Sequence, residues 1–421
     1  MKLLILFVVF GFAAAGLVYQ QSLIRVESRK MKMMKAGTWD AYHKEKQTLQ
    51  QSFDNKHQNM NDFDEVQYIA NLYIGTPPQA FKFYYDVNSQ DFWVTDKSCE
   101  NFYSDIPHCP SFCYKPSGAI FCNQKCRQNI AKTDGDERIC IQKTKYDSTK
   151  SSTFYHPNEP RENNRDYEFG YIVASFIGED KIMLEAEAPK FGYLTVRLAS
   201  FLQAKELSPA FADTPFDGML GFGPSSFFLS NVNNKLDKPM YTIYLNDTDE
   251  YNVTGGLITF GDFDKEHCSS EIEYQSTLSQ YTFMIYNISF DDSPTDKQAM
   301  QIPSEVTVDT ARSSIVGPPE IIKSLKEAAN ANEDGKIDCD AKIKDLSIQV
   351  SNESDPKILT IPGKHLIIRN PNGSCSIALE SMPPNSAFLN KWIFGVPWLK
   401  SYCNIFSFEN EQKIGFSKII V

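Results

Sequence analysis

The sequence lacks an excess of positive charge, and it has no long apolar run apart from its first residues. Its formal net charge is −11 over 421 residues, which argues against a nucleic-acid-binding protein because such proteins carry basic surfaces that contact phosphates. The hydrophobic content of 42%, with 13% aromatic residues, excludes a disordered chain. The length predicts two lobes, since a single hydrophobic core rarely serves a chain of this size.

The first residues have the pattern of a targeting signal. Lys2 precedes an apolar stretch at 3–10, and the small residues Ala13-Ala14-Ala15-Gly16 follow, so we predict a signal peptide at residues 1–16. The apolar stretch is short for a membrane-spanning helix, although a retained signal anchor is the alternative. We therefore expect no stable membrane span, and a protein that is secreted, extracellular or in the lumen of an acidic, lysosome-like compartment.

Ten cysteines suit a secretory chain and predict disulfide bonds. Six of them lie in a cysteine-rich insertion at residues 99–140, namely Cys99, Cys109, Cys113, Cys122, Cys126 and Cys140. Zinc binding by the CxxxC pairs is the alternative, but the oxidising compartment favours disulfides, and six cysteines leave 15 connectivities open. We expect no metal and no other cofactor. Five N-x-Ser/Thr sequons are candidate glycosylation sites, at Asn246, Asn252, Asn287, Asn352 and Asn372.

Residues 17–58 form a basic segment ahead of an acidic body. Eight Lys and Arg residues face four Asp and Glu residues there, for a net charge of +4. Such a segment can dock electrostatically on the rest of the chain, and we interpret it as a propeptide that covers a cleft until acid weakens the attraction. A solvated basic helix without a role is the alternative. The body then divides into an N-terminal lobe at 59–240 and a C-terminal lobe at 241–421.

From Tyr68 onward the pattern changes to period-two alternation with turn punctuation. Strands are predicted at 68–74 and 81–85, a hairpin at 167–176, and one clear helix at 320–329 after two prolines. Many short strands and few helices indicate a mainly β protein of two lobes with a cleft between them.

Two aspartates occupy similar short turns in the two lobes. Asp86 follows an aromatic strand in 83–94, and Asp309 follows an apolar strand in 306–317. Each is followed by an apolar strand that ends in glycine, at Gly221 and Gly395, which is a weak internal repeat. Glycines there would allow close approach of the backbone. Two aspartates on equivalent turns are what a carboxylate pair that activates water would look like in sequence.

Together these motifs resemble the pepsin-type aspartic protease family, from about Tyr68 to Val421. The matching segments are Ile74–Gln79, Asp86–Val94, Asp147–Phe154, Phe216–Gly221, Val308–Thr310, Phe394–Gly395 and Ile414–Phe416. The resemblance implies an all-β, bilobal acid protease fold with two β-barrel-like lobes. It implies a monomer that hydrolyses polypeptides with Asp86 and Asp309, which share one proton over one water. It also implies disulfides Cys268–Cys403 and Cys339–Cys375, and it places the family's propeptide around residues 23–45.

The chain departs from the family at both turns, where the family has Asp-Thr/Ser-Gly and then Ser/Thr. Val87 and Asn88 stand in the first turn, and Ala311 and Arg312 in the second, so both glycines are missing. By the resemblance, Thr310 can brace the opposite turn through its hydroxyl whereas Val87 cannot, and Ser89 keeps a hydroxyl for its aspartate. Arg312 either favours an ionised carboxylate or points to solvent.

The family's flap also differs in this chain. Phe169 precedes the flap Gly170 where the family has a tyrosine that is linked to a tryptophan, here Trp93, and Tyr171 lies two residues farther on. Two functions therefore compete. One is an active acid endopeptidase, and the other is an inactive relative whose cleft binds peptides without cutting them. An adhesive module built on 99–140 is a third and weaker alternative.

Overall fold

The computed structural model describes residues 17–44, 63–99, 140–156, 163–167, 170–185, 193–208, 211, 213–277, 281–290, 303–352, 354–382, 390–409 and 412–421. Several sequence predictions fall outside these residues. They are the signal peptide at 1–16, the part of the basic segment at 45–58, the four inner cysteines of the insertion (Cys109, Cys113, Cys122 and Cys126), and Phe169 of the flap.

The N-terminal lobe is built around a closed barrel of six strands. Its strands follow the order β2-β3-β8-β4-β7-β6, and pairing of β2 with β6 closes the barrel. The strands are β2 (Tyr68–Ile74), β3 (Gln79–Asp86), β4 (Phe92–Thr95), β6 (Gly170–Leu184), β7 (Leu194–Leu207) and β8 (Gly218–Gly221). The predicted hairpin is β5 (Asn163–Tyr167) paired with β6. Buried aromatic and branched apolar side chains from these strands fill the barrel.

The C-terminal lobe contains three smaller sheets. The largest has the order β12-β14-β22-β15-β21, with β12 (Thr282–Ile285), β14 (Ser304–Val308), β22 (Trp392–Phe394), β15 (Ile315–Gly317) and β21 (Leu379–Ser381). The other two sheets contain β13 (Asn287–Ser289), β17 (Leu346–Gln349) and β18 (Ile358–Ile361), and β16 (Lys336–Ile337), β20 (Cys375–Ile377) and β19 (Ile367–Arg369). The helix predicted at 320–329 is α5 (Pro319–Ala328), and α6 (Val396–Leu399) follows β22.

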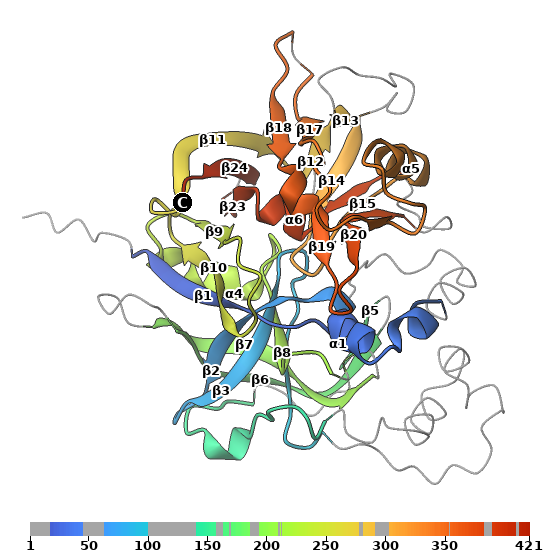
Figure 1. Cartoon of the computed structure of the whole chain (residues 1–421). Helices are drawn as coiled ribbons and strands as arrows, with labels where there is room; N and C mark the ends of the chain where they lie inside the picture. The colour runs from blue at the N-terminus through green and yellow to red at the C-terminus, as the bar shows by residue number, and fades with distance from the viewer. Residues whose placement is uncertain are drawn as a thin grey trace, which may run out of the picture.

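A run of antiparallel strands connects the two lobes (Figure 1). It has the order β11-β24-β23-β9-β10-β1 and continues into β2 of the barrel. These strands are β11 (Cys268–Ser276), β24 (Lys413–Ile419), β23 (Tyr402–Ser407), β9 (Met240–Leu245), β10 (Val253–Phe260) and β1 (Tyr19–Arg25). Strand β1 thus belongs to the basic segment, and it lies in the sheet between β10 and β2.

The described chain also contains short helices. Among them are α1 (Arg29–Lys35), η1 (Phe63–Glu65), η4 (Ser148–Lys150), α4 (Phe227–Val232), η6 (Asn233–Lys235) and η7 (Gly363–Leu366). Ser28 caps α1 by accepting a hydrogen bond from the N–H of Met31, as a serine at a helix N-terminus commonly does. None of the helices in the described part of the chain is long and apolar enough to cross a membrane.

The predicted internal repeat is confirmed by the strand pairing. In the first lobe, β8 runs parallel to β3 and antiparallel to β4. In the second lobe, β22 runs parallel to β14 and antiparallel to β15. Each lobe therefore inserts a later strand between the two strands that flank its aspartate turn. The fold is the all-β, bilobal fold that the resemblance implies.

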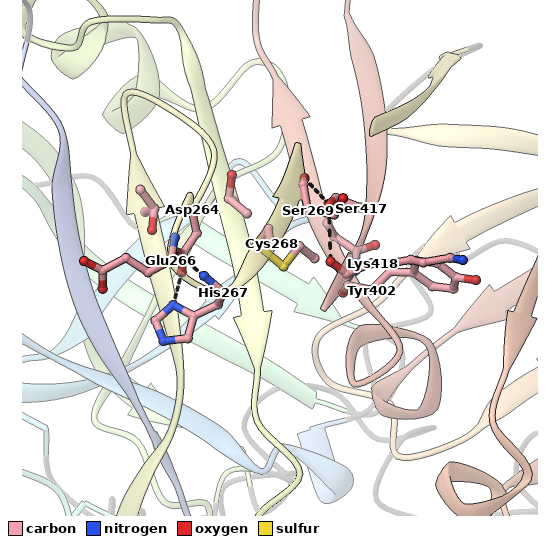
Figure 2. Close-up of a disulfide and its surroundings, with 12 residues drawn as sticks. Asp264, Glu266, His267, Cys268, Ser269, Tyr402, Ser417 and Lys418 are labelled. Carbon is pink, nitrogen blue, oxygen red and sulfur yellow. Dashed lines mark hydrogen bonds and ion pairs between the residues drawn. A yellow bond between two sulfur atoms is a disulfide. The ribbon is translucent and has the colours of Figure 1, made fainter. Parts of the chain in front are cut away.

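Three disulfides lie among the described residues. Cys99 pairs with Cys140 and so joins the two ends of the cysteine-rich insertion. Cys339 pairs with Cys375, and Cys268 pairs with Cys403, as the resemblance implies. Figure 2 shows the last of these, which links the start of β11 to β23. Beside it the buried Asp264 carboxylate accepts hydrogen bonds from the backbone N–H of Glu266 and His267, which fixes the turn before β11.

All five sequon asparagines lie on described residues. Asn252, Asn352 and Asn372 are exposed, whereas Asn246 and Asn287 are partly buried. The side-chain amide of Asn246 donates to the carbonyl of Thr254 at 3.0 Å. A glycan would have to be attached to that same nitrogen, so its surroundings are less open at Asn246 than at the three exposed positions.

Candidate active site

The first aspartate turn leaves the barrel at the end of β3. The backbone N–H of Phe222 donates to the carbonyl of Asp86 at 2.7 Å, and that of Gly223 donates to the carbonyl of Ser89 at 2.8 Å. A Cβ atom at Gly221 would lie 2.3 Å from the Ser89 carbonyl oxygen, so only glycine fits there. The end of strand β8 therefore packs directly against the backbone of the turn and holds it by hydrogen bonds.

The second aspartate turn is supported in the same manner. The N–H of Asp309 donates to the Phe394 carbonyl at 3.0 Å, and the N–H of Val396 donates to the Arg312 carbonyl at 2.9 Å. A Cβ atom at Gly395 would lie 2.3 Å from that Arg312 oxygen. As predicted, both glycines permit a close approach of backbone to backbone.

Each turn offers a backbone amide to its own carboxylate. The N–H of Asn88 donates to Oδ1 of Asp86 at 2.8 Å, and the N–H of Ala311 donates to Oδ1 of Asp309 at 2.7 Å. Both aspartates are buried, with 1% and 5% of their surface exposed. Neither Asn88 nor Ala311 adopts a positive φ, so the loss of the family's glycines places no side chain in the left-handed region.

The two turns also hold each other across the lobes. The Thr310 hydroxyl donates to the carbonyl of Tyr85 at 2.9 Å, and the Asn88 side-chain amide donates to the carbonyl of Val308 at 2.9 Å. Val87 cannot brace the opposite turn, and its side chain lies fully buried in the apolar core. Val87 therefore provides no brace, as expected, and the neighbouring amide of Asn88 makes the contact across the lobes instead.

Burial and the second carboxylate together change the acidity of Asp86. Loss of hydration raises its pKa to about 7, and the charge of Asp309 adds to this effect. The backbone N–H groups of Asn88 and Ser89 oppose the shift by donating to the ionised form. Oδ2 of Asp86 is buried and has no hydrogen-bond partner within the described part of the chain. The first carboxyl is therefore set to carry a proton at acid pH.

Arg312 lies against the second carboxylate and not in solvent. Its Nε is 3.9 Å from Oδ2 of Asp309, and only 12% of its side chain is exposed. A guanidinium at this distance stabilises the ionised carboxylate. The surroundings of the two aspartates therefore push them toward opposite protonation states.

Ser89 and Trp93 are placed differently from what the resemblance implies. The Ser89 hydroxyl accepts a hydrogen bond from the N–H of Asp91 at 3.0 Å, and it is the Ser89 backbone N–H that reaches Asp86. Trp93 is buried against Phe211 and Phe216, and its ring N–H has no partner within the described residues. Gly170 begins β6, while the side chain of Tyr171 is outside the described part of the structure.

Two further residues at the site were missed from sequence. The Tyr84 hydroxyl lies 3.0 Å from Oγ1 of Thr310, and the buried Glu65 accepts from the N–H of Ser313 at 3.0 Å. Since the single Thr310 proton is used on Tyr85, Tyr84 is the donor in its contact. The aromatic run before Asp86 was a signal for Tyr84, whereas nothing in the sequence pointed to Glu65. Among described residues, no three His, Cys, Asp or Glu side chains form a candidate metal site.

Comparison with known proteins agrees with this geometry. The family model described as "Eukaryotic aspartyl protease" matches residues 67–419. Aspartic protease 6 of Caenorhabditis elegans is 28% identical over 442 aligned positions that cover 99% of each chain. Aspartic protease 2 of Necator americanus is 26% identical over 99% of each chain. Cathepsin E-B of Xenopus laevis is 23% identical over 85% of this chain and 81% of its own. The chain therefore belongs to the eukaryotic aspartyl protease family.

Proposed function

We propose that the protein is an aspartic endopeptidase that hydrolyses peptide bonds of extended polypeptides at acid pH. The observation that carries this proposal is the unequal pair of buried carboxyls. Asp86 has its pKa raised to about 7, while Asp309 lies 3.9 Å from the Arg312 guanidinium. Such a pair holds one proton across the acid range, which is the state that acid–base hydrolysis needs.

From this asymmetry we propose a different role for each aspartate. The ionised Asp309 takes a proton from a water molecule as the water oxygen attacks the scissile carbonyl carbon. The protonated Asp86 donates a hydrogen bond through Oδ2 to the carbonyl oxygen and stabilises its developing negative charge. Asp309 then delivers its proton to the leaving nitrogen as the C–N bond breaks. The pair titrates as a unit, so its two apparent pKa values belong to both residues.

Acid-dependent cleavage by the full-length chain tests the proposal. The chain should be exposed to about pH 3–4, where a carboxylate pair is half-protonated, and mixed with denatured haemoglobin. We expect self-processing and substrate cleavage, both blocked by a pepstatin-like peptide. Absence of cleavage at every pH between 2 and 8, in a folded protein that still binds the inhibitor, would reject the proposal.

A peptide-binding protein without catalysis is the second candidate. Arg312 is the observation that favours it, because a cation beside Asp309 opposes sharing of the proton between the carboxyls. The inhibitor-binding arm of the same experiment decides between the two candidates, since a binder retains affinity for the peptide without cutting any substrate.

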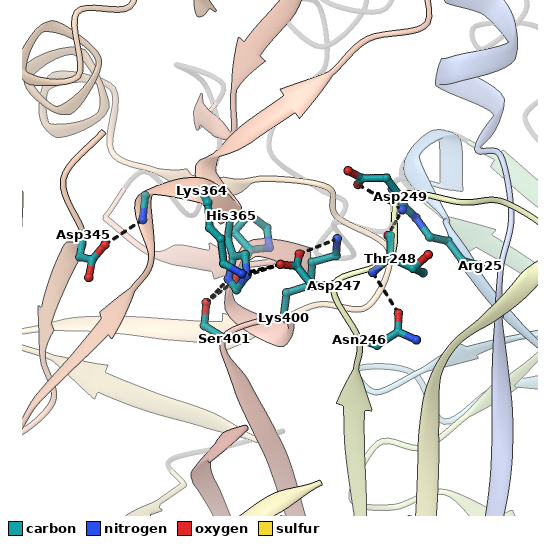
Figure 3. A network of polar contacts seen from close by, with 12 residues as sticks. Arg25, Asn246, Asp247, Thr248, Asp249, Asp345, Lys364, His365, Lys400 and Ser401 are labelled. Carbon is teal, nitrogen blue, oxygen red and sulfur yellow. Dashed lines mark hydrogen bonds and ion pairs between the residues drawn. The ribbon is translucent and has the colours of Figure 1, made fainter. Parts of the chain in front are cut away.

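We also propose that the basic segment at 17–58 is a propeptide held on the body by charge. Arg29 pairs with Asp64 at 2.6 Å, and Lys30 pairs with Glu65 and, at 3.3 Å, with Glu380 of the other lobe. At the end of β1, Arg25 contacts the carbonyl of Thr248 and the carboxylate of Asp249 (Figure 3). Acid would protonate these carboxylates and weaken the contacts.

Thr248 and Asp249 lie in loop 246–252, which also contacts later segments of its own C-terminal lobe. Asp247, two residues before Asp249, accepts from Lys364 at 2.6 Å and lies 3.5 Å from Lys400 and 3.6 Å from His365 (Figure 3). Loop 246–252 thus contacts both the basic segment and the residues near η7 and α6 of its own lobe.

Substitution of Lys30 tests the propeptide. Lys30→Ala removes the contact that spans Glu65 and Glu380, so self-processing should begin at a higher pH than in the wild type. Lys35→Ala is the matched control, because Lys35 forms its ion pair, at 2.5 Å, with Glu27 of the same segment. An unchanged onset pH for Lys30→Ala would contradict the proposal.

The remaining proposals concern location and modification. The family's members are typically secreted or lysosomal, and the disulfides suit such a compartment. We propose secretion through a signal peptide at 1–16, glycosylation at the exposed sequons, and action as a monomer on polypeptide substrates.

A further inference from the structure

The two cross-lobe hydrogen bonds are related by position as well as by length. Asn88 Nδ2 donates to the carbonyl of Val308, the residue directly before Asp309. Thr310 Oγ1 donates to the carbonyl of Tyr85, the residue directly before Asp86. Both distances are 2.9 Å. Each turn therefore holds the backbone from which the opposite aspartate departs.

The two donors nevertheless come from different places in their turns. Thr310 follows its aspartate directly, whereas Asn88 is two residues after Asp86. The residue that corresponds to Thr310 in the first turn is Val87, which has no polar atom in its side chain and packs in the apolar core with 0% exposure. The longer asparagine side chain spans the extra residue and delivers an N–H where a hydroxyl would otherwise be needed.

We propose that Asn88 is a positioning residue that sets the relative geometry of the two carboxyls through its side-chain amide. This inference rests on the proposed protease function. Asn88 touches both halves of the pair, since its backbone N–H binds Oδ1 of Asp86 at 2.8 Å while its side chain binds the carbonyl before Asp309. One residue thereby links the first carboxylate to the backbone of the second turn.

Among the described residues the side-chain amide of Asn88 has one hydrogen-bond partner, so its contribution can be tested by removing that single contact. Oδ1 of Asn88 is buried without a hydrogen-bond partner among the described residues. A carbonyl oxygen such as that of Val308 can bind only the amide nitrogen, so the orientation of the amide is fixed by this one contact. The opposite brace has additional support, because the Tyr84 hydroxyl binds Thr310 Oγ1 at 3.0 Å.

Substitutions at Val87 and Asn88 that move the hydrogen-bond donor from one position to the other test the assignment. Asn88→Gly gives the first turn the family's glycine but removes the amide, so kcat should fall about 10- to 100-fold with KM nearly unchanged, as misplacement of catalytic groups by a fraction of an ångström does. The double variant Val87→Thr with Asn88→Gly moves a donor to the position equivalent to Thr310, and it should recover kcat to within about 3-fold of the wild type. Thr310→Val, which breaks the opposite brace, should resemble Asn88→Gly.

Two more variants distinguish the loss of the Asn88 amide from a failure of the variant to fold. Asn88→Asp keeps the size of the side chain but cannot donate to Val308 when ionised, so its kcat should decline as pH rises and recover in acid. Asn234→Ala, at an exposed asparagine in η6, is the matched control and should leave kcat unchanged. Circular dichroism and the apparent melting temperature of the full chain establish that each variant is folded.

The outcomes separate this inference from the proposed function. If the wild type cuts substrate but Asn88→Gly keeps its kcat, or the double variant is no better than Asn88→Gly, the role of Asn88 is rejected while the protease function stands. If the wild type cuts nothing, the proposed function is rejected, and the melting temperatures of the variants then test the hydrogen bond from Asn88 to Val308. Asn88→Gly should then melt a few degrees lower and the double variant should recover, whereas equal melting temperatures would overturn the inference.

Discussion

In the first turn Asp86 is followed by Val87, Asn88 and Ser89, whereas in the second Asp309 is followed by Thr310, Ala311 and Arg312. The backbones of the two turns are arranged alike. In each turn the backbone N–H two residues after the aspartate donates to its carboxylate, and a strand that ends in glycine supports the turn through backbone hydrogen bonds. The side chains do not correspond position by position. The comparison teaches that the backbone frame of the pair survives changes at every position except the aspartates.

The difference between the turns is electrostatic. The pKa of Asp86 is raised by burial and by the neighbouring Asp309. Asp309 has the Arg312 guanidinium beside it. The surroundings therefore favour different protonation states for the two carboxyls before any substrate binds, and substitutions in either turn should change that difference.

The largest effect is expected at the aspartates themselves. Asp86→Asn and Asp309→Asn should each lower kcat about 10³-fold or more, because one member of a coupled pair retains little activity alone. Cleavage of denatured haemoglobin in acid measures this. Asp334→Asn, at an exposed aspartate, is the control and should behave as the wild type. An active Asp86→Asn or Asp309→Asn variant would remove that residue from the mechanism.

The same two variants should change stability in opposite directions at neutral pH. The pKa of Asp86 is raised from 3.8 to about 7, so the folded state binds this proton more tightly than the unfolded state does. The stability linked to it is complete below pH 4 and is lost as pH rises to about 7. Asp86→Asn removes that loss and should stabilise the chain at pH 7 by up to about 4 kcal/mol.

Asp309→Asn removes the carboxylate beside a mostly buried guanidinium and should destabilise the chain instead. Apparent melting temperatures at pH 5 and pH 8 measure both variants. A wild-type pH dependence that persists in Asp86→Asn would show that other groups cause it.

An intermediate effect is expected at Arg312. Arg312→Ser introduces the small hydroxyl residue of the first turn and removes a charge that favours ionised Asp309. The acid limb of the profile of kcat/KM against pH should then shift to higher pH by about one unit, because Asp309, the proposed base, loses its proton at a higher pH. Arg369→Ser is the control, since that exposed arginine pairs with Asp340 at 3.7 Å, away from the turns. An unmoved limb would mean that the contact between Arg312 and Asp309 has no electrostatic consequence.

The fold could be predicted from sequence because its signals are local. Period-two alternation predicted β2 and β3, and Gly221 and Gly395 marked the supporting strands. The pair Pro318-Pro319 marked the start of α5, which begins at the second proline. The docking of the basic segment was expected from its charge, yet its pairing as β1 was not. Tyr19, Gln21, Leu23 and Arg25 alternate as buried residues along that strand, and only Tyr19 and Leu23 among them carry the apolar signal on which such patterns rest.

The site could be predicted only as far as the identity of its carboxylates. Val87 correctly indicated a missing hydroxyl, but the replacement by Asn88 depends on a contact between residues 220 positions apart. The same holds for Glu65 and Ser313, which are 248 positions apart. Side chains that act across lobes leave no periodic or spacing signal, so their roles follow from packing alone.

The smallest effect is expected at Ser89, the counterpart of Arg312 in the first turn. Its hydroxyl accepts from the N–H of Asp91 at 3.0 Å, while Asp86 is held by backbone amides. Ser89→Ala should therefore lower kcat by less than about 3-fold and stability by about 0.5–1.5 kcal/mol, the contribution of one ordinary hydrogen bond.

A serine far from the turns provides the matched control for Ser89. The Ser269 hydroxyl accepts from the N–H of Glu271, also two residues on, at 3.2 Å. Ser269→Ala should show a similar loss of stability with full activity. If Ser89→Ala lost activity about 10-fold or more while Ser269→Ala did not, the Ser89 hydroxyl would have to turn toward Asp86 during the reaction. In both turns the residue three positions after the aspartate would then contact the carboxylate through its side chain. That side chain is the hydroxyl of Ser89 in the first turn and the guanidinium of Arg312 in the second.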